Sequence, residues 1–237
     1  MSSGIYIATA GATAQSHALD ATANNIANAS TAGFRSDRVV FQEALTAARS
    51  ADMSSVAVGT SRIDSQAGAL TTTDNPLDLA LEGDGYFGVE TPNGARYTRA
   101  GNFRIDDERR IVTTEGNTLR GEGGAPIVVP PETTALAVGT DGTVSADGNP
   151  IGKLELARFA SNQMSREGGT LYAAAGATQP GDAPKVRSGM LEASNVNIVR
   201  GVVDLVKVSR TYESLMKVIQ GYHDVESRAA RDLGGPK

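Results

Sequence analysis

The sequence contains no cysteine and no tryptophan, and its 237 residues include only two histidines, His17 and His223. The lack of cysteine excludes disulfides, cysteine-ligated zinc, iron–sulfur clusters and a cysteine nucleophile. Two histidines leave few ways to build a transition-metal site or a histidine-dependent triad. No apolar run approaches the roughly 18 residues that span a bilayer. We therefore expect no membrane insertion and no cofactor.

Basic residues are also in the minority, with a net charge of −5 and a pI near 5.1. This balance argues against electrostatic binding to nucleic acid or anionic lipid. The N-terminal residues Met1 to Ala10 lack both a basic segment and a long apolar segment, so we expect no Sec signal. Aromatic residues make up 5% and glycines number 27, which favours a turn-rich β protein or an assembly module over a deep small-molecule pocket.

The first 28 residues contain no proline and have the pattern of a helix. Apolar residues recur in them on a three- and four-residue spacing, which indicates a weak heptad seam of small side chains: Ile5, Ala8, Ala12, Leu19 and Ile26. Asn24, Asn25, Asn28 and Gly33 follow. Asparagine and glycine tolerate left-handed backbone angles, so we expect the helix to end there.

The last 44 residues predict a second, longer helix. Its apolar positions follow helical spacing: Ile198, Val202, Leu205, Tyr212, Met216 and Ile219. Ser194 or Asn195 is the expected N-cap. No proline appears before Pro236, so the helix should reach about 35 residues, or about 50 Å. A helix of this length without breakers indicates a coiled coil or a packed helical assembly.

In the middle of the chain, the apolar residues repeat at a shorter spacing than in the two terminal helices. Gly-containing turns separate short strand-like runs there. The runs that we predict as strands are 77–81, 86–89, 96–98, 103–105, 111–113, 127–129, 135–138 and 154–159. Because no helical pattern separates them, they predict an antiparallel β domain. The expected fold class is α+β, in which terminal helices form a coiled-coil-like domain around an inserted all-β domain.

The pattern divides the chain into five segments. Residues 1–35 carry the N-terminal helix and 194–237 the C-terminal helix of one helical core domain. Residues 76–180 form the β domain. Residues 36–75 and 181–193 are expected as partly extended connectors, the first with one short helix around Val39–Ala48.

Three motifs resemble ligand-binding or catalytic sites, and each has a simpler structural explanation. The G-x-G-x-x-G run from Gly83 to Gly88 is followed by a strand-like run, whereas a dinucleotide site needs a helix there. Asp141 and Asp147 lack the spacing of a calcium loop and fit hairpin turns better. The acidic and basic cluster at 106–110 fits a self-compensating hairpin tip better than a pair of catalytic carboxylates.

The two histidines both fall on the terminal helices. If these helices pair antiparallel, His17 and His223 could approach each other and sense pH. The simpler interpretation is that both lie exposed or at the edge of an interface. No constellation of residues indicates catalysis, and we expect the protein not to be an enzyme.

Four segments resemble one known family, in order along nearly the whole chain. Residues 23–35, Ala-Asn-Asn-Ile-Ala-Asn-Ala-Ser-Thr-Ala-Gly-Phe-Arg, resemble the N-terminal signature of bacterial flagellar rod and hook proteins. Residues 192–197, with Arg-Thr-Tyr-Glu at 210–213, resemble their C-terminal signature. Residues 75–87 and 97–103 are similar to their central β domain.

This resemblance implies a structural subunit of the flagellar basal-body rod. It implies terminal helices that line a tube, an outward β domain, and helical assembly with other copies and other rod proteins. It also implies export through the flagellar type III apparatus to the periplasmic basal body. The chain lacks the longer insertion of the distal rod protein, which favours the proximal rod. The alternatives are a distal rod subunit and a non-flagellar secreted coiled-coil adhesin.

The resemblance also suggests which residues carry assembly, since it assigns the contacts to the helices and to the segments that flank them. Ile5, Leu19 and Ile26 would pack against the C-terminal helix within one subunit or between subunits. The expected interface is Ile5, Leu19, Asn25, Ile26, Asn28, Gly33, Phe34, Asn195, Asn197, Val202, Leu205, Tyr212 and Ile219.

Overall fold

The computed structural model describes residues 3–44, 55–176, 178–179, 181 and 184–233. It forms two compact units, each made of separate stretches of chain. The helical unit comprises residues 1–27, 37–62 and 197–237, and the β unit comprises residues 28–36 and 63–196. The fold is α+β, with a helix at each end and a β-rich centre, as the sequence predicted.

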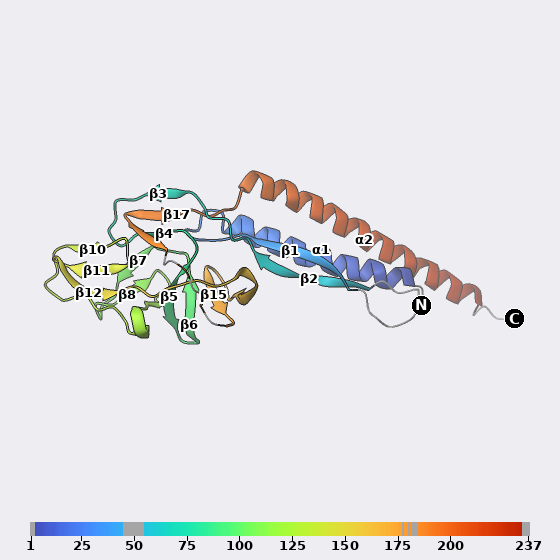
Figure 1. Cartoon of the computed structure of the whole chain (residues 1–237). Helices are drawn as coiled ribbons and strands as arrows, with labels where there is room; N and C mark the ends of the chain where they lie inside the picture. The colour runs from blue at the N-terminus through green and yellow to red at the C-terminus, as the bar shows by residue number, and fades with distance from the viewer. Residues whose placement is uncertain (1–2, 45–54, 177, 180, 182–183, 234–237) are drawn as a thin grey trace. The chain divides into compact units, whose positions relative to one another are not determined.

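The helical unit contains α1 (Ser3–Ala27) and α2 (Ile198–Leu233), which pack against each other along their length. In Figure 1 they lie side by side in blue and red. A two-stranded sheet of β1 (Asp37–Ala44) and β2 (Ser55–Ile63) accompanies them, and β1 packs against α1. Within the described residues, neither helix is sufficiently long and apolar to cross a membrane.

The short helix expected around Val39–Ala48 was a wrong prediction. Residues 39–44 belong to strand β1, and residues 45–48 lie outside the described part of the chain. The run Val-Val-Phe at 39–41 explains the strand, because β-branched and aromatic residues fit a pleated surface better than a helix.

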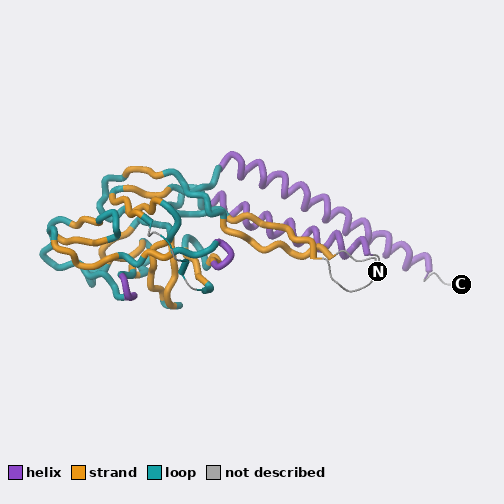
Figure 2. Tube along the Cα trace, viewed as in Figure 1, coloured by secondary structure: helices purple, strands orange, loops and turns teal. Residues whose placement is uncertain are grey.

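The β unit contains all the other strands and two short 3₁₀ turns, coloured orange and purple in Figure 2. The strands are β3 (Leu70–Thr72), β4 (Leu79–Glu82), β5 (Tyr86–Thr91), β6 (Gly94–Thr98), β7 (Phe103–Ile105), β8 (Ile111–Thr113), β9 (Thr118–Leu119), β10 (Leu136–Val138), β11 (Thr143–Ala146), β12 (Asn149–Lys153), β13 (Leu156–Ala157), β14 (Met164–Arg166), β15 (Leu171–Ala174), β16 (Lys185–Ser188) and β17 (Met190–Glu192). The 3₁₀ turns are Glu122–Gly124 and Ser161–Gln163.

The strands form one large sheet and three small ones. The large sheet runs in the order β14-β15-β6-β5-β9-β8-β7, with β13 also paired to β5. Strands β10-β11-β12 form a second sheet, and the pairs β16-β4 and β17-β3 join strands that are far apart in sequence. Every strand pair with a described register is antiparallel, so the prediction of an antiparallel β domain is confirmed for these pairs.

One apolar core connects the large sheet, the β10-β11-β12 sheet and the β16-β4 pair of the β unit. Phe87 of β5, Val144 of β11 and Val186 of β16 are all fully buried in it. A smaller cluster holds Tyr86 and Tyr172, whose rings meet edge to face at 5.5 Å. Burial on this scale is the main favourable contribution to the stability of the unit.

The turn signals located several strands correctly. β7 and β8 have the predicted bounds, and the charged loop between them forms a hairpin tip in which Arg110 pairs with Asp106 and Glu108. Residues 127–129 do not form a strand, since Val128 makes only an isolated bridge to Arg110. Strands β16 and β17 occupy residues 185–192, where we expected a connector.

Candidate assembly interface

The contact between α1 and α2 is a regular seam. One run of half-buried residues of α2 alternates at four- and three-residue spacing: Gly201, Leu205, Val208, Tyr212, Leu215, Ile219 and Tyr222. Asp204, Ser209 and Met216 flank this run and are also half-buried. Gly4 lies against Tyr222, while Gly201 lies against Ile26, so the two helices are antiparallel. The predicted positions Ile5, Leu19 and Ile26 are likewise half-buried.

Glycines on α1 allow α2 to approach closely, since Gly11 lies against Leu215. The buried residues of α1 are also small: Ala8, Ala12, Ala14 and Ala18. A Cβ placed on Gly4 would overlap the hydroxyl of Tyr222. The sequence therefore predicted the seam and its small side chains, but the Tyr222 contact was missed because glycine carries no hydropathy signal.

A groove opens between the helices beside this seam. It has a volume of about 450 Å³ and is lined by apolar residues with polar ones at one end: Leu19, Leu205, Val206, Ser209, Arg210 and Glu213. Leu19 comes from α1 and Leu205 from α2, so the structure brings together two of the predicted interface residues.

The first turns of α2 present a second apolar surface, which faces largely away from α1 and shares Val206 with the groove. We call Ile198, Val199, Val202, Val203 and Val206 the apolar face. These side chains are between 45% and 77% exposed. At 100° per residue they span an arc of about 140°, centred about 130° from the seam. Exposed apolar patches of this kind mark interaction sites in soluble proteins.

Two asparagines fix the ends of the helices. The carboxamide of Asn25 pairs with the backbone of Asp37, donating to its carbonyl at 2.8 Å and accepting from its N–H at 2.8 Å. Asn197 is the N-cap of α2, because its side-chain oxygen accepts from the N–H of Arg200 at 3.0 Å. The cap expected at Ser194 or Asn195 was therefore placed too early by two or three residues.

Four other predicted interface residues lie in the β unit. Gly33 has a φ of +68° and donates its N–H to the carbonyl of Glu192 at 2.7 Å. Phe34 is 1% exposed, and the guanidinium of Arg166 lies 4.4 Å from the centre of its ring. Asn28 accepts from the N–H and the hydroxyl of Thr31, which shapes the turn after α1.

Asn195, the fourth of these residues, joins three stretches of the β unit. Its side chain accepts from the N–H of Ser36 at 2.7 Å and donates to the carbonyls of Asp64 and Gln66. Its own N–H donates to the carbonyl of Phe34 at 3.3 Å. These contacts are internal to the subunit, and they suggest that part of the signature serves the fold.

The remaining predicted residues lie on α2 in two positions. Leu205, Tyr212 and Ile219 belong to the seam with α1, whereas Val202 is 46% exposed on the apolar face. Sequence reasoning placed all four on one stripe. The structure separates them because only part of a helix can face a single partner.

The histidines do not approach each other. His223 follows Tyr222, which lies against Gly4, while His17 is 13 residues farther along α1. At 1.5 Å per residue, this separation corresponds to about 20 Å along the helix pair. Both side chains are exposed, so the simpler interpretation is confirmed, and the two histidines of one subunit do not form a shared pH sensor.

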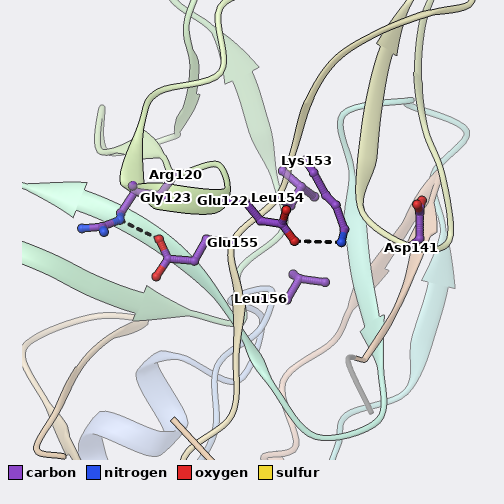
Figure 3. A pocket seen from close by; sticks show the side chains of 9 residues that line it. Arg120, Glu122, Gly123, Asp141, Lys153, Leu154, Glu155 and Leu156 are labelled. Atoms are coloured by element: carbon purple, nitrogen blue, oxygen red, sulfur yellow. Dashed lines mark hydrogen bonds and ion pairs between the residues drawn. The ribbon is translucent and has the colours of Figure 1, made fainter. Parts of the chain in front are cut away.

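The β unit has a shallow hollow of about 300 Å³ that is rich in charge (Figure 3). Its charged groups neutralise one another: Arg120 bonds to Glu155 at 2.8 Å and to Glu90 at 2.7 Å, and Lys153 bonds to Glu122 at 2.7 Å. Burial lowers the pKa of Arg120, but its bonds to the two carboxylates outweigh burial and raise it.

The other pKa shifts in this hollow also favour the charged form of each group. The bond to Glu122 raises the pKa of Lys153, and hydrogen bonds from Thr143 lower the pKa of Asp141. Each group is held in its ordinary charged form, whereas a general acid or base needs a pKa close to the working pH. The hollow therefore has the electrostatics of a structural ion-pair network.

The remaining motifs have structural roles. Gly83 to Gly88 lead into strand β5, so no helix N-terminus is present to bind a phosphate. Asp141 lies in the turn between β10 and β11, where it accepts from Thr143. Asp147, at a φ of +48°, and Gly148 turn the chain between β11 and β12. These findings confirm the hairpin interpretation.

Comparison with known proteins gives one consistent result. Three family models match in order: flagella basal body rod protein over residues 5–35, flagellar hook protein FlgE/F/G D1 domain over 80–146, and flagellar basal body rod FlgEFG protein C-terminal over 187–232.

Relatives along nearly the full length agree with these matches. The chain is 31% identical to the flagellar basal-body rod protein FlgF of Rhizobium meliloti, with 100% of both chains covered. It is 36% identical to FlgF of Caulobacter vibrioides over 91% of each chain. It is 33% identical to the rod protein FlgG of Bacillus subtilis, covering 85% of this chain and 88% of the relative.

Proposed function

This chain belongs to the flagellar basal-body rod proteins, and from that premise we propose that it builds the proximal rod by helical assembly through its terminal helices. The chain is a structural subunit of the rod and not an enzyme, and it is most like FlgF. It works in the flagellum together with other rod components. The comparisons do not favour the adhesin alternative.

The observation that carries the assembly proposal is the apolar face of α2. The seam covers one side of the helix with α1, while Val199, Val202 and Val203 remain exposed on the other side. A second subunit would remove these side chains from water, at a gain of roughly 25 cal/mol per Å² of apolar area.

The groove beside Leu19 and Leu205 offers a surface that the apolar face of a neighbouring subunit could fill. The two surfaces share only Val206, so such a contact is heterologous. A heterologous contact that does not close into a ring generates an open helical assembly. The heptad spacing of the seam supports a coiled-coil-like packing of the helices in that assembly.

The proximal position is supported by length. FlgF relatives from Rhizobium meliloti and Escherichia coli align over 100% and 97% of this chain. Export through the flagellar type III apparatus and a periplasmic position are further proposals that rest on the family resemblance. Fractionation of a tagged subunit tests them, since the proposal requires periplasmic subunit in an export-competent strain and none in a strain that lacks the apparatus.

The assembly proposal is tested by Val203→Asp, which places a charge on the apolar face without touching the seam. Gln220→Asp is the matched control, because it adds the same charge at an exposed polar position of α2. We expect both purified variants to show the helicity of the unmodified chain by circular dichroism. In cells, Val203→Asp should lose rods in electron micrographs of basal bodies and lose swimming, whereas Gln220→Asp should keep both. Normal rods with Val203→Asp would refute the proposed surface.

A further inference from the structure

Three charged side chains are fully buried together in the β unit. Arg35, Arg99 and Glu192 are each about 2% exposed. One oxygen of Glu192 bonds to Arg35 at 2.9 Å and the other bonds to Arg99 at 3.0 Å. We call this group the closure. It is distinct from the helical surfaces that serve the assembly proposal.

The closure joins segments that are remote in sequence. Arg35 lies 157 residues and Arg99 lies 93 residues before Glu192. Glu192 also accepts two backbone bonds, from the N–H of Gly33 to its carbonyl and from the N–H of Gly68 to its carboxylate. Residue 192 thus ties three earlier stretches of the chain, around residues 33–35, 68 and 99, to the end of strand β17.

Glycines let the backbones meet at this point. A Cβ on Gly33 would overlap the backbone of Arg99, and a Cβ on Gly68 would overlap the carbonyl of Ala193. A Cβ on Gly101 would overlap the carbonyl of Leu79. These segments therefore pack backbone against backbone, so the arginines have no room to move apart or reach water while the rest of the unit is folded.

Glu192 supplies the negative charge that makes this burial tolerable. Burial and then the charge of Arg35 lower the pKa of Arg99, while Glu192 acts in the opposite sense. Arg99 also donates to the carbonyls of Leu81 and Gly83, so it is anchored to β4 and the turn that follows it. Without Glu192, two guanidinium groups would be buried without a counter-charge, which is strongly unfavourable.

We propose that Glu192 gates the folding of the β unit, so that residues 28–36 and 63–176 acquire their stable core only when the segment around 185–196 docks. The same segment supplies β16 and β17, the partners of β4 and β3. A chain that emerges from its N-terminus onward therefore keeps its β unit open until nearly 200 residues are free. This inference concerns the chain itself and holds whether or not the proposed rod position is correct.

Hydrogen-exchange pulse labelling during refolding of the full chain tests the gate. The amides of Gly33 and Gly68 report docking of Glu192, since Glu192 is their acceptor. The amides of Gly88 and Arg120, bonded to Glu155 and Gly88, report the large sheet. We expect all four amides to gain protection with one time constant. Protection of Gly88 and Arg120 at least tenfold faster than that of Gly33 and Gly68 would overturn the proposal.

Variants provide a second test in refolding and unfolding kinetics, followed by the fluorescence of the tyrosines. Glu192→Gln keeps the shape but removes the charge. Glu122→Gln is the matched control, because Glu122 pairs with Lys153 at an exposed position of the same unit, outside the segment around 185–196. We expect Glu192→Gln to refold at least tenfold more slowly and Glu122→Gln to refold at the unmodified rate. Equal refolding rates for both variants would overturn the gate. If Glu192→Gln does not fold, the labelling of the unmodified chain decides.

Discussion

The side-chain amide of Asn195 donates a hydrogen bond to the backbone carbonyl of Gln66, at 3.0 Å and across 129 residues of sequence. The same amide reaches the carbonyl of Asp64 at 3.4 Å. Asn195 therefore acts here as a donor. Asn197, two residues later, uses its side-chain oxygen as the acceptor of the α2 N-cap.

This difference predicts opposite results for one substitution. Asn195→Asp removes the donor and sets a carboxylate against two carbonyls, so it should lower the free energy of unfolding by about 1–3 kcal/mol. Asn197→Asp preserves the cap and adds a negative charge at a helix N-terminus, so it should be neutral or slightly stabilising. Urea unfolding of both variants measures this. A loss with Asn197→Asp as large as that with Asn195→Asp would contradict the assignment.

Alanine substitution at two glycines with positive φ distinguishes the cost of backbone strain from the cost of steric overlap. Gly116 has a φ of +91° with no atom within 4 Å of an added Cβ, so Gly116→Ala should cost only the strain, about 1–2 kcal/mol. Gly33→Ala adds overlap with the backbone of Arg99 and Ala100 and should cost more than about 4 kcal/mol. Thermal unfolding of the full chain measures both, and equal costs would show that the chain relaxes around residue 33.

A third prediction concerns the close approach of α1 and α2. Gly221 has no neighbour within 4 Å of an added Cβ, so Gly221→Ala should stabilise the helix pair by up to about 1 kcal/mol through helix propensity. Gly4→Ala should give no such gain, because its Cβ overlaps the hydroxyl of Tyr222. Adding Tyr222→Phe to Gly4→Ala should recover part of the missing stabilisation, because it removes the overlapping hydroxyl. Far-ultraviolet circular dichroism on heating measures all three, and a full gain with Gly4→Ala alone would refute the contact.

Asp141 predicts a pH dependence. The hydroxyl and N–H of Thr143 donate to its carboxylate, which lowers its pKa below the ordinary 3.8. A depressed folded pKa means that Asp141 stabilises the fold above pH 3.8 and loses this contribution as the pH falls through the lower folded value. Unfolding free energy between pH 5 and pH 2 should therefore fall less steeply for Asp141→Asn than for the unmodified chain. Asp107→Asn, at an exposed hairpin tip, is the control, and identical slopes for Asp141→Asn would exclude the effect.

Local signals were sufficient for much of the fold. The spacing of Leu205, Tyr212 and Ile219 identified α2, and Gly-containing turns located β7 and β8 to the residue. These elements depend on neighbours within a few residues, so their pattern is visible in the sequence. The helix expected around Val39–Ala48 was wrong over residues 39–44, because the β-branched Val39 and Val40 disfavour a helix and the pairing of β1 with β2 stabilises the strand.

Long-range features could not be predicted in the same way. β17 pairs with β3, more than 100 residues earlier, and residues 190–192 alone carry too few side chains to show a strand period. Charged residues are usually exposed, so nothing in the sequence distinguished Arg35, Arg99 and Glu192 from surface ions. The only available signal was that Arg35 and Glu192 lie at the edges of the two family signatures.

The bond between the N–H of Gly33 and the carbonyl of Glu192 also has a mechanical meaning. It links two of the four stretches of chain by which the β unit joins the helical unit. A tensile load that pulls residues 28 and 196 apart is therefore borne first by this bond, by the bonds of Asn195 to Phe34 and Ser36, and by the ion pair between Arg35 and Glu192. Strands β5 and β9 are not part of this direct link. In a rotating shaft, the β unit would yield at this small set of contacts before its large sheet opens.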